Sequence, residues 1–562
     1  MSTPILPLDV DHLADTHTVF NQPPPLEGYN SYRYDSALNE GVIRCGASWA
    51  QDGLLAHGER CGSAEVYEWG FLANEVKPRF ESHDRQGFRI DTVKYHEAYH
   101  RLMALGLESG LHSAPWSDPG EGAHVARAAQ YLLQAQVESG HGCPLTMTFA
   151  SVPTLRMAPD LADQWLPKVL TRAYDPRNIP HTQKRALTIG MGMTEKQGGS
   201  DVRANTSVAH PVGGTGPGRA YALTGHKWFT SAPMCDGFLM LAQSAGGLSC
   251  FLVPRWREDG SKNQVQVQRL KNKVGNVANA SSEIEMRGAL GWMVGEEGRG
   301  VSAIIEMVSM TRFDCMIGSS AAQRQAIAQA VNHAAGRGVF GKLLIDQPLM
   351  RNVLADMQLE YEGAIAMTLR MAQALDRSMS PVGNEAEQQL LRLGLPTGKY
   401  WICKRTPFLV YEAMECMGGN SVTEDFIMAR LYRDAPINAI WEGSGNVQAL
   451  DVLRAIDREP QIMDAWFAEL AYARGADSCL DAAVDSLQVL LNQHSKRELN
   501  ARRITDLLAL SMQAALLVNF GNATVAKTFI ASRLSGGSHC NYGTLVADTD
   551  LSAILDRANP LA

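Results

Sequence analysis

The sequence predicts an α+β multidomain protein, with helical regions on both sides of a strand-rich middle and a further helical segment at the end. In 124–138, apolar residues recur at helical spacing on one stripe and polar residues lie opposite. Between about 186 and 290, short apolar runs separated by glycine turns replace this pattern. At 562 residues, the chain is too long for one core and suggests about three or four domains.

The composition is ordinary for a soluble globular protein, with 45% hydrophobic and 20% charged residues. A net charge of −8 gives no overall attraction to nucleic acid or to an anionic membrane. No apolar run is long enough to span a bilayer, and the acidic and proline residues near the start argue against a secretory signal. Ten cysteines without a C-x-x-C pair predict neither a metal site nor a disulfide framework. We therefore expect a cytoplasmic protein without a membrane partner.

The first two regions differ in regularity. Residues 1–40 are expected to form an extended arm, because three consecutive prolines at 23–25 interrupt a stretch rich in Asn, Ser and Tyr. Residues 41–185 follow the helical pattern and are predicted to form an N-terminal helical domain. The proline-containing stretch 175–180 breaks this pattern and ends the domain.

Residues 186–290 are predicted to be built from strands. The segments 238–242 and 249–253 are short apolar runs, 265–270 alternates between apolar and polar residues, and the glycine-rich 213–218 is a turn. Many short strands joined by glycine turns are typical of a β-barrel or a β-sandwich.

Helical spacing returns in 291–455, which is predicted to be a helical bundle, and continues in 456–562, an extra C-terminal helical domain. In this last segment, 504–520 carries an apolar face at helical spacing. The bundle contains two such faces. They comprise Phe313, Met316, Ile317, Ser320, Ala321, Arg324, Ile327, Ala328 and Val331, and then Met350, Val353, Leu354, Met357, Tyr361 and Ile365.

The stretch 191–202 (MGMTEKQGGSDV) is rich in glycine and hydroxyl groups. Glycine lets backbone amides come close to a flat or charged group, and the hydroxyls of Thr194 and Ser200 can donate or accept hydrogen bonds. Just downstream, Trp228 and Phe229 lie within a polar strand. Together these features suit a planar heterocycle with carbonyl edges. Taken singly, each is typical of a turn or of a core aromatic residue.

The segments 194–201 (TEKQGGSD) and 225–230 (GHKWFT) resemble the flavin site of the acyl-CoA dehydrogenase family, and the order of helical, strand and helical blocks resembles that family too. The resemblance implies an N-terminal α-helical domain, a middle β-barrel and a C-terminal α-helical bundle, with FAD as the cofactor. It places Trp228 against the flavin ring and Thr230 near N5. The residues implied to contact the isoalloxazine or pyrophosphate are Met191, Met193, Thr194, Gly199, Ser200, Trp228 and Thr230.

A third motif, 440–446 (IWEGSGN), resembles the family loop whose glutamate removes the α-proton of an acyl thioester while a hydride moves to the flavin. Glu442 is therefore the expected base. Some relatives place the base on another helix, where this chain has Thr311, which cannot act as a base. Arg312 resembles an arginine near the active site, and a helix-end salt bridge is an equal alternative. The loop's expected cofactor contacts are Gly443, Ser444 and Asn446.

A fourth motif begins at Arg337 (RGVFGKLL) and resembles the segment with which a neighbouring subunit grips the adenine half of the cofactor. Arg337 would meet the pyrophosphate, and Phe340 would lie against the adenine end. A helix end followed by a core phenylalanine is the alternative. Gln347 and Gly419 are further implied contacts. Sites completed across an interface imply a homo-oligomer, and a homotetramer is expected.

Ordinary members of this family would end near residue 455, whereas a branch linked to protection of DNA from alkylation damage in the adaptive response continues beyond it. The resemblance therefore implies double-stranded DNA as a partner. Nine Lys and Arg against twelve Asp and Glu in 456–562 give a net charge of −3, so a solvated helix face is the alternative. The candidate phosphate contacts are Lys496, Arg497, Arg502, Arg503 and Arg533.

Two functions follow from these observations. The first is an FAD flavoprotein with an acyl-CoA dehydrogenase-type oxidoreductase site and DNA-binding capacity, linked to protection against DNA alkylation. The second is a metabolic acyl-CoA dehydrogenase for short branched-chain substrates without a nucleic-acid role. In both, an acyl-CoA or another small molecule is the expected substrate.

Overall fold

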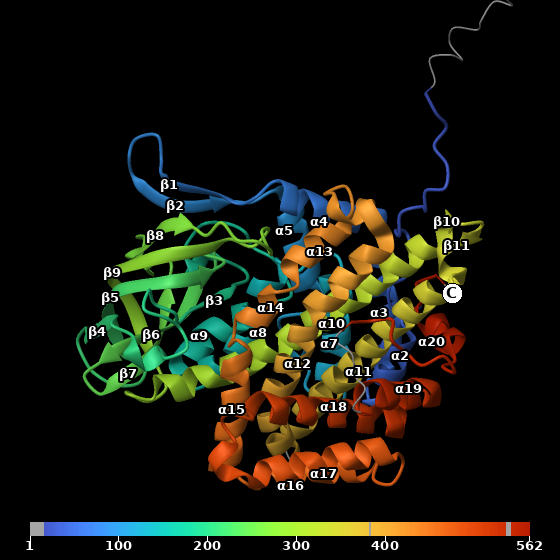
Figure 1. Cartoon of the computed structure of the whole chain (residues 1–562). Coiled ribbons are helices and arrows are strands. Elements are labelled where there is room, and N and C mark those ends of the chain that lie inside the picture. Colours follow the sequence, from blue (N-terminus) through green and yellow to red (C-terminus); the bar gives the residue numbers. More distant parts are fainter. Residues whose placement is uncertain (1–15, 381–383, 536–540, 562) are drawn as a thin grey trace, which may run out of the picture.

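The computed structural model describes residues 16–380, 384–535 and 541–561 (Figure 1). In Figure 1 the strand-rich middle region lies at the left, and the long helices fill the centre and right. Within the described ranges, no helix is both long and apolar enough to cross a membrane.

The N-terminal arm runs without helix or strand from residue 16 to Asp35. There the Asp35 carboxylate accepts a hydrogen bond from the amide of Leu38 and caps the first helix, which begins at Ser36. The helix therefore starts within the segment that the sequence suggested would be extended.

The N-terminal domain is mainly helical but includes a two-stranded hairpin, which the sequence did not predict. The hairpin pairs β1 with β2 and extends over the middle region (Figure 1). The elements are α2 (Ser36–Arg44), α3 (Gln51–Cys61), α4 (Ala64–Glu75), β1 (Arg79–His83), β2 (Arg89–Lys94), α5 (Glu97–Glu108), α6 (Ala114–Ser117), α7 (Ala123–Ala135), α8 (Gly142–Leu155) and α9 (Pro159–Val169).

The middle strands close into a barrel. Strand β6 pairs with β7, β7 with β9, β9 with β5 and β5 with β4, and β4 returns to β6 through the pairing of Val208 with Gln243. This closed ring decides between the barrel and the sandwich, and it confirms the barrel. Strands β3 and β8 pair with β6 and β9. The strands are β3 (Ile189–Gly192), β4 (Val208–Pro211), β5 (Ala220–Ser231), β6 (Gly237–Ser244), β7 (Gly247–Pro254), β8 (Val265–Leu270) and β9 (Ser281–Val294).

A bundle of long helices follows, with α10 at its centre. Helix α10 is buried over most of its length because α7, α8, α11 and α12 all pack against it. The bundle comprises α10 (Gly300–Gly336), α11 (Pro348–Ser378), α12 (Glu385–Met417), α13 (Ile427–Asp434), α14 (Ile437–Ile440) and α15 (Gly445–Arg458), with the short strands β10 (Gly338–Val339) and β11 (Lys342–Leu343) after α10 and the 3₁₀ helix η5 (Gly418–Val422) after α12.

The C-terminal segment packs directly on the bundle. Helix α18 contacts α11, α12 and α15, and α20 contacts α11, so the segment shares the hydrophobic core of the bundle. Its elements are α16 (Ile462–Ala471), α17 (Ser478–Asn492), the 3₁₀ helix η6 (His494–Lys496), α18 (Ala501–Phe520), α19 (Ala523–Arg533) and α20 (Leu551–Ala558). The predicted fold class, helical and barrel domains with additional C-terminal helices, is therefore confirmed.

Candidate active site

The two glycine-containing stretches meet on the barrel. The amide of Trp228 on β5 donates to the carbonyl of Thr194, with 2.8 Å between nitrogen and oxygen. Beside this bond, the buried Glu195 carboxylate lies 2.9 Å from Nζ of the buried Lys227. Glu195 also accepts a hydrogen bond from the amide of Thr206 at 2.7 Å. These contacts fix the loop after β3 against β5.

The sequence interpretation missed the pair of Glu195 and Lys227. The sequence feature that could have indicated this pair is the presence of one acidic and one basic residue in the two neighbouring motifs. Burial raises the pKa of Glu195, but the hydrogen bond from Ser207 and the charge of Lys227 outweigh it and hold the pKa well below its usual range. The pair is therefore ionised and anchors the loop.

The predicted flavin contacts of this region share one part of the barrel. The hydroxyl of Thr230 is buried and has no hydrogen-bond partner within the described residues. An unpartnered buried hydroxyl costs about 1–3 kcal/mol, so this position fits a polar group of a ligand. Met191 lies on β3, Met193, Thr194, Gly199 and Ser200 lie in the loop that follows it, and Trp228 and Thr230 lie on β5.

The loop between α14 and α15 holds Glu442 in a left-handed backbone conformation. The φ angle is +56° at Glu442 and +102° at Gly443. A non-glycine residue in this region costs on the order of 1–3 kcal/mol. Donors on three helices hold the two carbonyls: Nε of Arg312 (3.2 Å) and Nε2 of Gln448 (2.8 Å) bind the carbonyl of Glu442, and Lys399 and Gln448 (3.0 Å) bind that of Gly443.

The carboxylate of Glu442 accepts a hydrogen bond from the hydroxyl of Thr311 at 2.9 Å. Burial raises the pKa of Glu442, and this effect outweighs the opposing Thr311 hydrogen bond and the charges of Arg312 and Lys399. A raised pKa makes the carboxylate a stronger base once it is ionised. Arg312 also forms an ion pair with Asp451 at 2.6 Å, but it lies within α10 rather than at a helix end.

The Glu442 loop and the end of β5 both lie near one buried thiol. It belongs to Cys143 on α8, and burial raises its pKa to about 11. A hydrogen bond with Ser231, next to Thr230 on β5, opposes this rise, and the nearby charge of Glu442 reinforces it. The Cys143 thiol is therefore close to both the end of β5 and the Glu442 carboxylate.

The other predicted cofactor contacts lie elsewhere in the chain. Thr311 lies about a third of the way along α10, whereas Arg337 caps its C-terminal end, roughly 40 Å away along the axis. Phe340, at the tip of the β10–β11 hairpin, is 96% exposed and has a φ of +53°. Gln347 follows the hairpin, and Gly419 lies in η5. Within a single chain, these predicted contacts with the adenine half of the cofactor therefore lie far from Glu442.

Asn446, near the start of α15, links two predicted sites. Its side-chain oxygen accepts a hydrogen bond from Nε of Arg502 at 2.8 Å, and Ser444 directly precedes α15. A predicted cofactor contact and a predicted DNA contact are therefore neighbours.

The five predicted DNA contacts differ in their surroundings. Arg533 is only 12% exposed and forms an ion pair with Asp356 at 2.7 Å, so it belongs to the interior and is unsuited to phosphate contact. Arg497 pairs with Asp457 at 2.7 Å. Within the described part of the chain, no carboxylate lies within 4 Å of the remaining three. These exposed residues are Lys496, Arg502 and Arg503.

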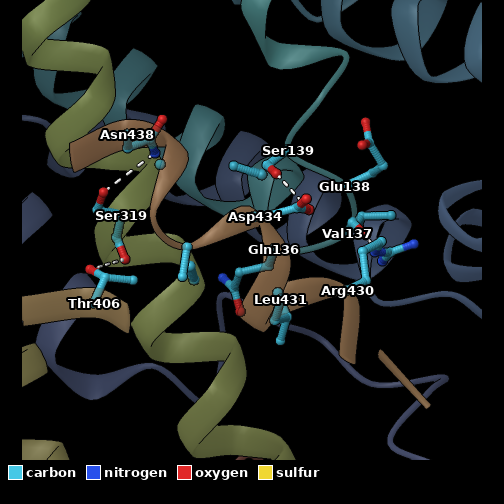
Figure 2. A pocket seen from close by; sticks show the side chains of 14 residues that line it. Gln136, Val137, Glu138, Ser139, Ser319, Thr406, Arg430, Leu431, Asp434 and Asn438 are labelled. Carbon is cyan, nitrogen blue, oxygen red and sulfur yellow. Dashed lines mark hydrogen bonds between the residues drawn. The ribbon is translucent and has the colours of Figure 1, made fainter. Parts of the chain in front are cut away.

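Figure 2 shows a small cavity, lined by both apolar and polar residues, that the sequence interpretation did not predict. In it the hydroxyl of Ser139 donates to Asp434 at 3.1 Å, and Asn438 donates to Ser319 at 3.3 Å. Burial raises the pKa of Asp434 to about 6. Asn438 also accepts a hydrogen bond from the Trp441 indole at 3.0 Å. The cavity is therefore joined to the residue that precedes Glu442.

Comparison with known proteins identifies the family. Residues 190–289 match the acyl-CoA dehydrogenase middle domain, 298–456 match the acyl-CoA dehydrogenase C-terminal domain, and 21–176 match the adaptive response protein AidB N-terminal domain. The chain is 45% identical over 516 residues to the putative acyl-CoA dehydrogenase AidB of Escherichia coli, an alignment that covers 92% of this chain and 94% of that protein. The chain belongs to the acyl-CoA dehydrogenase family.

Solved structures of acyl-CoA dehydrogenase family members agree with this assignment. ACDH-11 of Caenorhabditis elegans, solved in complex with C11-CoA, superposes with a TM-score of 0.84 at 27% identity, covering 94% of this chain and 93% of that one. An acyl-CoA dehydrogenase of Bacillus anthracis complexed with FAD shares the fold, with a TM-score of 0.61 at 18% identity, covering 77% and 79%. Family membership confirms FAD as the cofactor, and the unpartnered Thr230 hydroxyl fits it.

Proposed function

We propose that this acyl-CoA dehydrogenase family member oxidises an acyl thioester, with Glu442 as the base that removes the α-proton. The observation that carries the proposal is the strained turn that holds a partly buried carboxylate against the Thr311 hydroxyl, near the buried Cys143 thiol that also neighbours β5. Desolvation strengthens such a base, and the locked backbone fixes its direction.

The residues divide the work of the reaction. FAD, when bound, supplies the acceptor for the hydride that leaves the β-carbon. Glu442 takes the α-proton on its carboxylate, and the Thr311 hydroxyl stabilises the anionic form before that transfer. The loop after β3, with Thr194, Gly199 and Ser200, and the Thr230 hydroxyl on β5 would hold the cofactor, and the unpartnered state of that hydroxyl supports this role.

Anaerobic bleaching of the flavin tests this proposal, with isovaleryl-CoA and a C11 acyl-CoA as probes. We expect at least one probe to bleach the wild-type flavin. Glu442→Gln removes the proton acceptor and should slow bleaching by about 10²–10⁴-fold. Glu498→Gln, an exposed control in the C-terminal segment, should bleach like the wild type. A wild-type flavin that neither probe bleaches, or a Glu442→Gln protein that bleaches normally, would contradict the proposal.

We also propose that each cofactor site is completed by a second copy of the chain, in a homotetramer. Support comes from Phe340, a bulky apolar side chain that is 96% exposed in one chain on a hairpin remote from Glu442. In this arrangement Arg337, Phe340, Gln347 and Gly419 of one copy contact the cofactor held by the barrel of another.

A second candidate function is binding of double-stranded DNA by the C-terminal segment, as part of protection against alkylation. The exposed cations Lys496, Arg502 and Arg503 support it, since no carboxylate within the described ranges lies near enough to pair with them. The similarity to AidB along nearly the whole chain makes a purely metabolic role the less favoured alternative.

The salt dependence of duplex binding tests the DNA proposal. Lys496→Gln combined with Arg503→Gln leaves the contact of Arg502 with Asn446 intact, and it should reduce the slope of log affinity against log salt by about two. Arg474→Gln is the matched control, because Arg474 is already paired with Asp485 at 2.9 Å. Duplex binding that is independent of salt, or equally affected by both changes, would count against the proposal.

A further inference from the structure

Lys399 on α12 is a buried cation without a carboxylate partner. Its side chain is among the largest that are fully buried, with 1% of the residue exposed. Within the described residues, no carboxylate lies within 4 Å of its ammonium group, and its hydrogen bond goes to the carbonyl of Gly443. Burying an ammonium group costs several kcal/mol unless its surroundings compensate. The placement of Lys399 against the catalytic loop therefore calls for a functional explanation.

Other charged and titratable groups lie around the loop. Lys404 and Arg502 approach Gly445, but neither is among the charges that shift the pKa of Glu442. From α10, Arg312 faces the loop, but its charge is balanced by Asp451 at 2.6 Å. The thiols of Cys315 on α10 and Cys143 on α8 are buried, and burial raises the pKa of both, so they are neutral. Of the two cations that affect Glu442, Arg312 and Lys399, it is Lys399 that has no carboxylate within 4 Å in the described part of the chain.

The bond from Lys399 also reaches a strained part of the backbone. It holds the carbonyl of Gly443, directly after the left-handed Glu442. The second donor to this carbonyl, Gln448, lies on α15, which begins within the same loop, whereas Lys399 lies on a separate long helix of the bundle. Lys399 therefore connects the loop to α12, a helix that is separate from α14 and α15 on either side of the loop.

We propose that Lys399 is a positioning residue for Glu442, which orients the base by anchoring Gly443 and places an uncancelled positive charge beside the carboxylate. This inference rests on the proposed function, because it gives Lys399 a role through the base. The nearby cation favours the ionised carboxylate and opposes the effect of burial. Loss of the cation should raise the pKa of Glu442, so that the active, ionised base appears only at higher pH.

Two substitutions separate the hydrogen bond from the charge in the FAD-loaded protein. Lys399→Gln can still donate a hydrogen bond but is neutral, whereas Lys399→Met removes both properties. Lys527→Met, an exposed position on α19, is the control for loss of a lysine charge. Hydrogen–deuterium exchange of the peptide covering 440–446 reports the anchoring. The pH profile of anaerobic bleaching by isovaleryl-CoA, or by the C11 acyl-CoA if only that probe bleaches the wild type, reports the charge.

We expect Lys399→Met to raise amide exchange in the loop about tenfold and to move the pH midpoint of bleaching up by about one unit. Lys399→Gln should keep most of the loop protection but show the same upward shift in pH. The control should match the wild type in both measurements. Because Lys399→Gln is the milder change, it tests the charge even if Lys399→Met fails to fold.

Two outcomes overturn the inference. One is a wild-type pH midpoint in Lys399→Gln, which would show that the charge does not act on Glu442. The other is unchanged loop exchange in a folded Lys399→Met protein. The first outcome, accompanied by loss of thermal stability and FAD in both variants, would make Lys399 purely structural. A wild type that no probe bleaches refutes the proposed function instead, and the exchange data then still decide the anchoring.

Discussion

Thr311 and Glu442 lie on different elements, but their side chains meet at one point, 2.9 Å apart. A carboxylate introduced at 311 would therefore reach nearly the same position as that of Glu442. Thr311→Glu combined with Glu442→Gln should recover at least about tenfold of the bleaching rate lost in Glu442→Gln alone, since a general base contributes about 10²–10⁴-fold.

Thr311→Gln combined with Glu442→Gln is the control for this relocated base, because it has the same shape without the carboxylate. The comparison uses bleaching rates with isovaleryl-CoA and with the C11 acyl-CoA. Both are measured on FAD-loaded proteins of equal thermal stability. Equal rates for the double variant with glutamate and the control would show that position 311 does not face the reacting carbon.

At the residue scale, the sequence predicts roles for groups that lie in a local motif. Glu442 and Thr230 are such residues, and they lie in the loop between α14 and α15 and on β5. The sequence did not predict a role for Lys399, because Lys399 lies 44 residues from the carbonyl that it binds and no motif surrounds it. The interior position of Arg533 was equally hidden, because its partner Asp356 lies 177 residues away.

At the scale of elements, the N-terminal arm clamps the β10–β11 hairpin. The side-chain amide of Asn21 donates to the carbonyl of Gly338 at 2.9 Å and accepts from its amide at 2.6 Å. The backbone carbonyl of Asn21 accepts from Arg337 at 2.6 Å. One arm residue thus makes three bonds to the segment that carries Phe340.

Removing this clamp should loosen the hairpin. We expect Asn21→Gly, which keeps the left-handed backbone (φ +57°) but lacks the amide, to weaken FAD binding about tenfold, the effect of losing about 1.4 kcal/mol. Flavin fluorescence gives the dissociation constant, and sedimentation gives the oligomeric state. Val19→Ala, in the exposed part of the same arm, is the control. An unchanged dissociation constant in Asn21→Gly would refute this role of the arm.

The elements themselves were predicted unevenly, for physical reasons. Helices α11 and α18 carry apolar stripes at helical spacing, and the sequence located both. Strands β1 and β2 are mostly half-buried, so they lack the strong alternation that identifies a strand. The closure of the barrel depends on the pairing of β4 with β6, a contact between segments that no local pattern joins.

At the scale of the whole molecule, the sequence predicted the order of the regions but not how the C-terminal helices pack against the bundle. The boundary near 455 suggested a separate C-terminal domain, whereas α18, α19 and α20 complete the surface of α11. Arg557 on α20 binds Glu362 on α11 at 2.5 Å and Glu40 on α2 at 2.8 Å. Such long-range contacts follow from packing, which the spacing of residues within one helix does not reveal.

The contact between Arg557 and Glu40 joins residues 517 positions apart, and this has a consequence for synthesis. On the ribosome, α11 emerges long before the helices that cover it. At about 5–20 residues per second, the roughly 180 residues from the end of α11 to the end of α20 take about 9–36 s to appear. During that interval the apolar face of α11 lacks the helices that cover it, so we expect holding chaperones to bind the nascent chain until α20 has been made.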